Sequence, residues 1–461
     1  MKAPWQPGRP PGLVQIAWPL FSELLLGTLV GLAGLALAAR VSDASSGAYA
    51  MANHVQQAFF LLFRIISMGV SVVITQQLGA GDRQGADASA RAALGASSWL
   101  GLGAGLAVAA GAGVLLGLMN VPAEVLPLAQ PFLQWLAIGL ALDAYNASMA
   151  AVMRAHLHAR DALIVMLAMQ ALHLLLCLPL MDGIGPLPAL GLPGFAIALA
   201  ASRALGLVLH LWLWRRRLAI VPTRSDWWAI HRGLLGPVLH IGLPGAAENI
   251  AWRLAMMTSV ALVAGMGVPQ LATQSYTLQI QNFVLLFGVA VGFASEILVG
   301  HLIGAGRLHE ADRLVHKSMR WGLAVGTLGA LAAALSAPWT LPLFTRDPQV
   351  VAWGSGLLWI AVLLEPGRVF NLVVINALRA TGDARFPVAV GSGSMLLVMA
   401  GGSWLLGVHF GLGLTGVWIA YTADEWLRGL MMAARWQRRG WLAHARATHR
   451  RVSRARRLTA A

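Results

Sequence analysis

Charged residues are scarce in this chain. Lys, Arg, Asp and Glu make up 11% of its 461 residues, and 58% of the residues are hydrophobic. Soluble domains carry about 25% charged residues, so such a composition does not supply the surface of a water-soluble protein. No stretch shows the period-2 alternation of a membrane barrel strand. The sequence therefore predicts an all-α membrane protein with many spans.

Cysteine is almost absent, and so are the motifs of catalysis. Cys177 is the single cysteine, which excludes an intrachain disulfide, a CxxC site and a thiolate metal cluster. The sequence has no H-E-x-x-H pair, no Walker loop and no nucleophile elbow. We expect that the protein binds no cofactor and no metal, and that it is not an enzyme. The rival from another class, a membrane-embedded enzyme, would need a His/Asp/Ser or metal constellation at one depth, which we do not find.

Long apolar runs are abundant. A helix needs about 20 residues to cross a hydrocarbon core of roughly 30 Å. The first run is too long for a signal-peptide core and no small-residue cleavage site follows it, so we expect it in the mature protein. Twelve runs qualify: 13–39, 47–77, 92–118, 125–152, 162–181, 194–214, 236–264, 272–303, 318–344, 351–378, 386–407 and 412–433.

The positive charge is distributed unevenly along the chain. The net charge of +15 raises the possibility of nucleic-acid binding, but most Lys and Arg residues lie at the amino terminus, in alternate connections and after the last run. The intervening connections hold only Arg40 and Arg346. By the positive-inside rule, this pattern predicts a multi-pass membrane protein with both termini in the cytoplasm. It argues against a nucleic-acid partner.

The two halves of the sequence resemble one another at a spacing of 225 residues. Pro19 and Glu23 match Pro244 and Glu248, and the Gly-Ala-Gly run that ends at Gly81 recurs at Gly306. Arg154-Ala155 likewise matches Arg379-Ala380, and near the end of each half the spacing falls to 222.

Each half of this repeat holds six spans. The two halves therefore run parallel, related by a pseudo-two-fold axis along the membrane normal, as in transporters built from parallel repeats. The predicted parts are a cytoplasmic N-terminus (1–12), an N-terminal lobe (13–214), a cytoplasmic linker (215–235), a C-terminal lobe (236–433) and a basic cytoplasmic tail (434–461).

These features together resemble the multidrug and toxic compound extrusion (MATE) family, in one of its bacterial branches. The more specific matches are the two Pro-x-x-x-Glu motifs, Arg379-Ala-Thr-Gly-Asp383 and Asp424-Glu425-Trp426-Leu427-Arg428. The resemblance implies export of bulky, often cationic, organic compounds through the plasma (inner) membrane in exchange for protons or sodium ions. It also implies two lobes around a cavity lined largely by spans 1, 2, 7 and 8.

The sequence departs from the family pattern in the first lobe. Many members carry an Asp eleven residues after the first P-x-x-x-E glutamate, where this chain has Gly34. Some also use an Asn and an Asp in span 5, where a loose alignment places His173 and Cys177. The amino-terminal cation site of those relatives is therefore predicted to be absent or rebuilt. His173 could titrate near neutral pH, although a single His on an apolar helix is more often a packing residue.

Several acidic residues fall inside the spans, where a charge must face a partner or a watery cavity. Glu23 and Glu248 are the candidates for cation coupling or substrate binding. The alternative is a structural salt bridge, of Glu23 with Arg64 and of Glu248 with Arg253. Glu365 with Arg368 and Glu425 with Arg428 are each three residues apart, so each pair could neutralise itself along one helix. Asp424, Glu425 and His173 are secondary candidates.

Polar and aromatic residues of spans 2, 7 and 8 are candidates for the lining of a substrate cavity. Amides there could contact varied substrates or bond helix to helix, and aromatic rings could contact flat cations or pack against lipid. The candidates are Asn53, Gln56, Gln57, Phe60, Arg64, Arg253, Tyr276, Gln279, Gln281 and Asn282.

We interpret the chain as a secondary-active antiporter that works by alternating access. The alternative within transport is a lipid-linked sugar flippase of the same superfamily, which fourteen spans would favour over the twelve counted here. The expected partners are small organic substrates and the lipid bilayer, the expected coupling ion is H⁺ or Na⁺, and the expected state is a monomer.

The predicted topology can be tested with a reporter fused after Ala461. A reporter that works only in the cytoplasm should be active there, because the basic connections hold that end inside. Activity of a periplasm-dependent reporter at the same position would reverse the assignment.

Overall fold

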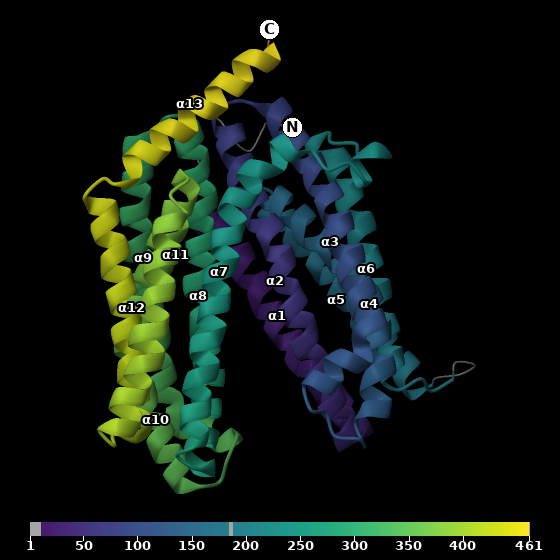
Figure 1. Ribbon diagram of the computed structural model, residues 1–461, viewed down its shortest axis with the longest axis vertical. Helices are drawn as coiled ribbons and strands as arrows, with labels where there is room; N and C mark the ends of the chain where they lie inside the picture. Colours follow the sequence, from purple (N-terminus) through teal and green to yellow (C-terminus); the bar gives the residue numbers. More distant parts are fainter. Residues whose placement is uncertain (1–10, 184–187, 461) are drawn as a thin grey trace. The chain divides into compact units, whose positions relative to one another are not determined.

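The chain folds into helices joined by short connections (Figure 1). The computed structural model describes residues 11–183 and 188–460, and within these ranges no β-strand occurs. The all-α class is confirmed. The helices of the first half are α1 (Leu13–Val41), α2 (Asp43–Gly79), α3 (Arg83–Leu118), α4 (Leu126–Ala155), α5 (Ala159–Asp182) and α6 (Leu192–Leu213), which a π-helical turn extends to Leu218.

The second half repeats this order and adds one helix. Helix α11 is short, but π-helical turns continue it to His409, so that it occupies the whole of the predicted eleventh span. The helices are α7 (Arg232–Ala264), α8 (Val268–Gly304), α9 (Leu308–Thr340), α10 (Pro348–Thr381), α11 (Arg385–Ser394), α12 (Gly413–Gln437) and α13 (Trp441–Ala460).

Each of the twelve predicted spans coincides with one long helical segment. Among the described residues, ten segments are long and apolar enough to cross a membrane, and the remaining two predicted spans fall on α7 and α12. The chain is a multi-pass membrane protein. Helices α3 and α9 begin well before the predicted edges at 92 and 318, because each helix continues through a charged segment that precedes its apolar run.

The described chain divides into two compact units. Unit 1 comprises residues 22–74 and 83–242, and unit 2 comprises residues 11–21, 75–82 and 243–460. In unit 1, α4 packs against α3, α5 and α6, and in unit 2, α10 packs against α8, α9 and α12. Helices α1, α2 and α7 each contribute to both units, and in α1 and α7 the division comes within three residues of Pro19 or Pro244.

Within unit 2, the end of α2 meets the end of α8 at the repeated Gly-Ala-Gly runs. A Cβ on Gly79 would collide with the carbonyl oxygen of His301, and a Cβ on Gly304 would collide with that of Gln76. At the spacing of 225 residues, Gly79 corresponds to Gly304 and Gln76 to His301. A Cβ on Gly300 would likewise collide with the hydroxyl of Thr75, which is also 225 residues away. Glycine is therefore required here because two backbones pass without room for side chains.

Helix α13 lies across the ends of three other helices of unit 2. Arg456 donates to the carbonyl of Ala80 at the end of α2 (3.0 Å) and Thr448 to that of Thr381 at the end of α10 (3.1 Å). His449 Nδ1 lies 2.8 Å from the carbonyl oxygen of Gly304, the last residue of α8. Helix ends leave carbonyls without partners inside their own helix, and basic side chains suit their negative dipole ends. The sequence predicted a basic tail here but no helix.

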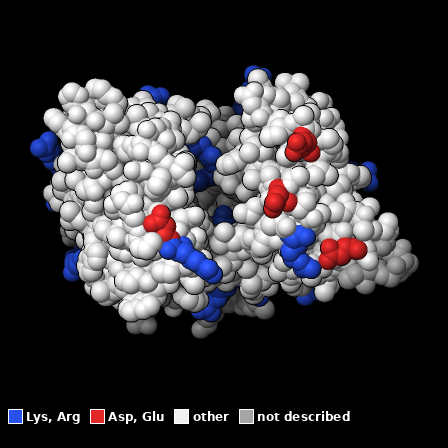
Figure 2. Space-filling model, turned by 90° about the horizontal axis from the view of Figure 1, so that it is seen from below, with Lys and Arg blue, Asp and Glu red and all other residues white. Residues whose placement is uncertain are grey.

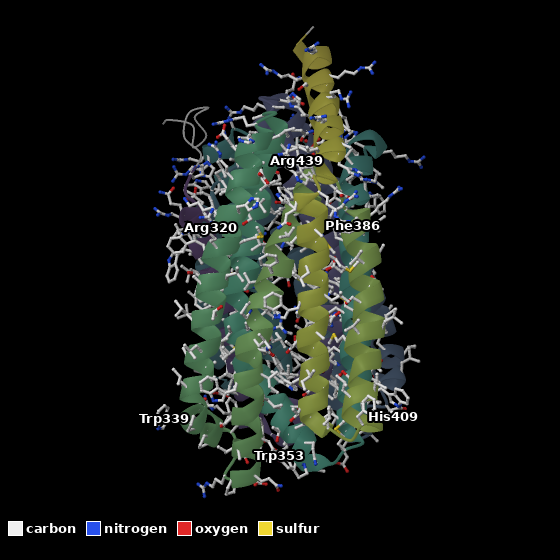
Figure 3. All side chains as sticks on the ribbon, turned by 90° about the vertical axis from the view of Figure 1, so that its left-hand side faces the viewer. Arg320, Trp339, Trp353, Phe386, His409 and Arg439 are labelled. Carbon is white, nitrogen blue, oxygen red and sulfur yellow. The ribbon has the colours of Figure 1, made fainter. Side chains whose placement is uncertain are left out.

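The two ends of unit 2 differ in chemistry (Figure 3). Arg320 and Arg439 lie towards the end that carries α13, whereas Trp339, Trp353 and His409 lie towards the other end. Trp339 is 73% exposed, as expected for an aromatic residue at a membrane–water interface. Seen from below, the surface has few charged side chains (Figure 2). The orientation of these two ends relative to the cytoplasm stays a prediction from the loop charges.

The close passage of α2 and α8 can be tested by substituting Gly79 with Ala. We expect a loss of about 1–3 kcal/mol, typical of an overpacked contact, because the obstructing atom belongs to the backbone. Thermal unfolding of the detergent-purified protein measures the effect. Gly103→Ala is the matched control, since a Cβ there meets nothing within 4 Å and the helix should be unharmed. Equal melting temperatures for the two variants would contradict the contact.

Candidate functional site

Both Pro-x-x-x-Glu glutamates are held in partly buried ion pairs. Glu23 Oε2 lies 2.9 Å from Arg154 Nη1 in unit 1, and Glu248 pairs with Arg379 in unit 2. The side chains of Glu248 and Arg379 are only 12% and 7% exposed. The partners suggested from sequence, Arg64 and Arg253, were wrong.

The positions of these arginines explain the pairing. Arg154 and Arg379 stand in the last turns of α4 and α10, where the sequence counted them among loop charges. From these positions Arg154 reaches α1 and Arg379 reaches α7. In each pair, the two partners are 131 residues apart in the sequence. The repeated Arg-Ala dipeptide was the available signal. Because the spacing of 225 relates the two acids and also the two arginines, one ion pair has been duplicated with the chain.

A second buried ion pair lies in unit 1. Asp143 Oδ1 is 2.7 Å from Arg203 Nε, and Gln56 Nε2 lies 3.5 Å from the other oxygen of Asp143. Asn146 donates to the carbonyl of Arg203 (2.9 Å), and its own oxygen is met by the Nδ1 atom of His210 (3.1 Å). One acid therefore faces one base. The nitrogen and the oxygen of the Asn146 side chain both have hydrogen-bond partners.

Unit 2 holds a longer chain of charges between α10 and α12. Arg368 lies between Glu365 (2.8 Å) and Glu425 (3.1 Å). Arg428 lies between Glu425 (2.9 Å) and Asp424 (2.7 Å). The two pairings predicted along the helices, Glu365 with Arg368 and Glu425 with Arg428, are both present. The contacts between α10 and α12 were not predicted.

Three polar residues from other positions complete this chain of charges. Gln281 on α8 donates to Glu365 (3.0 Å), Ser394 on α11 lies 2.6 Å from Asp424, and Asn371 donates to Glu425 (3.2 Å). We call the five charged residues from Glu365 to Asp424 the α10–α12 charge chain: Glu365, Arg368, Glu425, Arg428 and Asp424.

The two buried clusters occupy equivalent places in the repeat, with opposite polarity. Asp143 corresponds to Arg368 at the spacing of 225, and Arg203 corresponds to Glu425 at 222. An acid on α4 facing a base on α6 has thus become a base on α10 facing an acid on α12. Both arrangements keep opposite charges in contact, so the reversal preserves the ion pair. It changes which helix carries the acid and which carries the base.

Gly34 and its neighbours show what replaces the acid of many MATE relatives. A Cβ on Gly34 would collide with the hydroxyl of Tyr49, whose ring also makes an edge contact with Phe195 (5.3 Å between centroids). His173 is buried and packs edge-on to Phe195 (4.7 Å), and Cys177 is buried as well. Aromatic packing fills this part of unit 1, so it offers no room for an acidic side chain at Gly34.

The cavity candidates are divided by their surroundings. Gln56 and Gln281 are engaged by acids, and Tyr276 stacks on Phe344 (5.5 Å). Phe60 contacts Phe63 and keeps 40% of its surface exposed. Exposed side chains also occur at Gln57 and Asn282, and partly exposed ones at Asn53, Arg64, Arg253 and Gln279. Their part in substrate binding stays a prediction.

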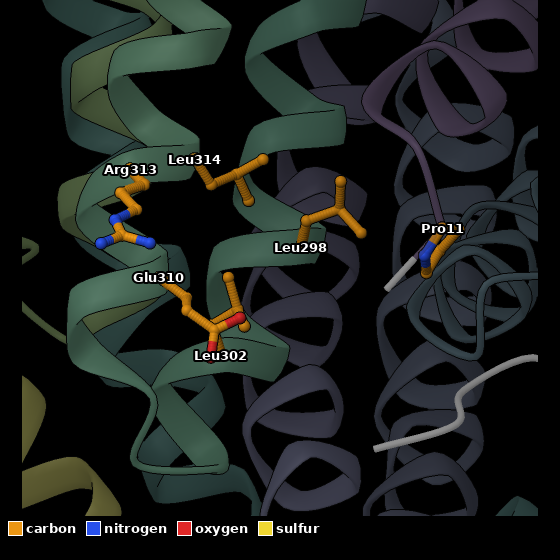
Figure 4. Close-up of a pocket in the computed structure, with 6 residues that line it drawn as sticks. All are labelled: Pro11, Leu298, Leu302, Glu310, Arg313 and Leu314. Carbon is orange, nitrogen blue, oxygen red and sulfur yellow. The ribbon is translucent and has the colours of Figure 1, made fainter. Parts of the chain in front are cut away.

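A pocket near the start of α9 is less suited to a cation (Figure 4). Leucines on α8 and α9 and Pro11 form much of its lining. Its acid, Glu310, is already paired with Arg307. In the described part of the chain, no three His, Cys, Asp or Glu residues gather in a way that could hold a metal ion.

His156, in the connection after α4, is the nearest titratable neighbour of Arg154 along the chain. Burial lowers the pKa of His156 to about 4, and the nearby positive charges of His158 and Arg83 act in the same direction. Its Nδ1 lies 2.9 Å from the carbonyl of Val152. The imidazole is therefore neutral at physiological pH and does not add a charge beside the Glu23–Arg154 pair.

The energetic role of the Glu248–Arg379 pair can be measured with a double-mutant cycle. Glu248→Gln should lower stability by about 3–5 kcal/mol, because it leaves a buried guanidinium without its counter-charge. Arg379→Gln should act similarly, whereas the double variant should be less destabilised than the sum of the two. Thermal unfolding in detergent reports each value. Additive losses would show that the two side chains do not depend on one another.

Comparison with known proteins supports the fold and its duplication. The family model described as MatE matches residues 19–178 and again residues 244–404. The chain is 31% identical over 430 residues to the "Uncharacterized transporter YisQ" of Bacillus subtilis, covering 93% of this chain and 94% of that protein. It is 24% identical to the "Probable multidrug resistance protein NorM" of Thermotoga maritima, with 94% of both chains covered.

Solved structures show the same fold. The structure described as "Crystal structure of MATE in the bent conformation" superposes with a TM-score of 0.85 at 20% identity, covering 95% of this chain and 96% of that one. A MOP superfamily transporter from Pyrococcus furiosus gives a TM-score of 0.85 over 94% of this chain and 96% of its own. With the family model matching both halves, the chain belongs to the MatE family of transporters.

Proposed function

We propose that this protein exports organic, often cationic, compounds across the plasma membrane in exchange for protons or sodium ions. The observation that carries the proposal is the pair of family matches, one in each half of a duplicated chain. Relatives named as multidrug resistance proteins support the substrate class. In this proposal, the two repeats move against one another and open the substrate site to each side of the membrane in turn.

The buried charges of both units support coupling to a cation. Ionisable groups at membrane depth are unfavourable unless paired, and in transporters they mark ion and substrate pathways. Both repeats retain the pair that begins at Glu23 or Glu248, and unit 2 adds the α10–α12 charge chain. Coupling at Glu248 stays a prediction from the sequence, and its pairing with Arg379 supports the structural alternative.

Gradient-driven transport by the purified protein in liposomes tests this function. Tetraphenylphosphonium should accumulate against its own gradient when a pH or sodium gradient is imposed. One pH unit corresponds to about 1.4 kcal/mol and sustains about tenfold accumulation in one-for-one exchange. Nigericin should abolish a proton-driven signal and monensin a sodium-driven one, with protein-free liposomes as the control. Equal uptake with and without either gradient would exclude cation-coupled transport.

A further inference from the structure

Arg253, on α7, carries a positive charge that no acid neutralises. The arginines Arg203, Arg368 and Arg428, which also lie within predicted spans, each face an acid of their own unit. In the part of the chain that the structure describes, Arg253 has neither an ion pair nor a hydrogen-bond partner. Its charge is therefore left for a group that the protein does not itself supply.

The depth of Arg253 makes this unusual. Helix α7 ends at Ala264, eleven residues farther on, which is about 17 Å at 1.5 Å per residue. Since the hydrocarbon core is about 30 Å thick, Arg253 lies near the middle of its span. Basic side chains reach the membrane surface only from near helix ends, and a charge at mid-depth is unfavourable against lipid. The partly exposed side chain of Arg253 therefore faces water.

The acids that flank Arg253 in the sequence cannot reach it. Glu248 lies five residues earlier, which turns it about 140° around the helix from Arg253 at 3.6 residues per turn, and it is already paired with Arg379. The next acid along the chain is Glu296. It follows the start of α8 by 28 residues, so it lies about 25 Å deeper than Arg253 relative to the α7–α8 connection at 1.5 Å per residue.

The other repeat has no such charge. At the spacing of 225, Arg253 corresponds to Thr28, whose hydroxyl donates to the carbonyl of Leu24 (3.1 Å). The duplicated pair of Glu248 with Arg379, in contrast, keeps its arginine in both repeats. Arg253 is therefore not part of the framework that both units share.

The neighbours of Arg253 on α7 suit an organic molecule. Asn249 lies one turn before it on the same face, and Met256 and Met257 lie one turn after it. Met257 is 69% exposed, and methionine side chains adapt to apolar bodies of varied shape. A planar guanidinium beside them binds a carboxylate through two parallel N–H bonds. A phosphate group is usually met by a cluster of arginines, whereas this site offers one charge for one charge.

We propose that Arg253 binds the carboxylate of the transported compound, so that the protein prefers organic substrates that carry a carboxylate on an apolar body. This inference rests on the proposed function and names the substrate class. The guanidinium N–H groups donate to the carboxylate oxygens, and the bound substrate neutralises Arg253 while it crosses the membrane. Arg253 thus determines specificity through a charge that is uncompensated only when the site is empty.

A matched pair of dyes tests this preference. The probes are a cationic rhodamine methyl ester and the same dye as its free carboxylic acid, with binding to the purified protein in detergent measured by fluorescence anisotropy. Wild-type protein should bind the acid more tightly than the ester. Arg253→Gln should weaken binding of the acid about tenfold or more, since bonds to charged groups are lost, and that of the ester less than about twofold. Arg320→Gln, which removes an exposed arginine of α9, is the control and should change neither value.

A second variant keeps the test decisive if Arg253→Gln fails to fold. Arg253→Lys retains the charge but not the fork of N–H groups, so the preference for the acid should fall several-fold. Equal affinity of the wild type for acid and ester, or an unchanged preference in either variant, overturns the inference.

Uptake of the same dyes into liposomes separates this inference from the proposed function. Gradient-driven accumulation of the ester by wild-type protein, without any preference for the acid, would retain the proposed function and overturn the role of Arg253. Binding that is selective for the carboxylate, without gradient-driven transport of either dye, would refute the proposed function and retain Arg253 as a carboxylate site.

Discussion

An ionised side chain at membrane depth needs its counter-charge within the protein, and much of this structure follows from that constraint. Neither lipid nor a packed helix interior hydrates a carboxylate, so Glu23, Asp143, Glu248, Glu365, Asp424 and Glu425 each face a guanidinium from another helix or another turn. Arg154 and Arg379 therefore tie α4 to α1 and α10 to α7. Where helices meet without such pairs, as at Gly79 and Gly304, close backbone packing holds them instead.

Duplication gave the chain two copies of each ion pair, and the copies have diverged to different extents. The Glu–Arg pair is unchanged between repeats, as is the Gln at 56 and 281. The second pair has reversed its charges, which is tolerated because attraction between opposite charges does not depend on which helix carries which sign. Around the reversed pair, Leu140 corresponds to Glu365 and His210 to Met432. These exchanges change the polar groups that surround the ion pair in each unit.

Much of the fold could be predicted because apolar runs define the spans and recurring short motifs define the repeat. Apolar runs placed all twelve long helical segments, and the spacing of 225 anticipated that equivalent residues would make equivalent contacts. The ion-pair partners could not be predicted, since Glu23 and Arg154 are 131 residues apart and nothing in either motif says which helices meet. Pairings along one helix, such as Glu365 with Arg368, were predictable from spacing alone.

Two further features were beyond sequence reasoning for different reasons. The substitution at Gly34 was visible, but only the structure shows that Tyr49 occupies the space an acid would take. Helix α13 was hidden by its many arginines, although a buried stripe of Trp441, Ala445, Thr448 and Val452 repeats with helical spacing. Composition described the tail only as basic and cytoplasmic, whereas periodicity would have shown that one face of it packs.

The position of α13 has a consequence for biogenesis. It follows all twelve spanning segments in the chain, and it supplies partners for the terminal carbonyls of α2, α8 and α10. Because α13 is the last helix in the chain, these carbonyls have no partner from α13 until its synthesis is complete. Of these three helices, α2 is synthesised first. The contacts of α13 with these three helix ends can therefore form only after all twelve spanning segments have been synthesised.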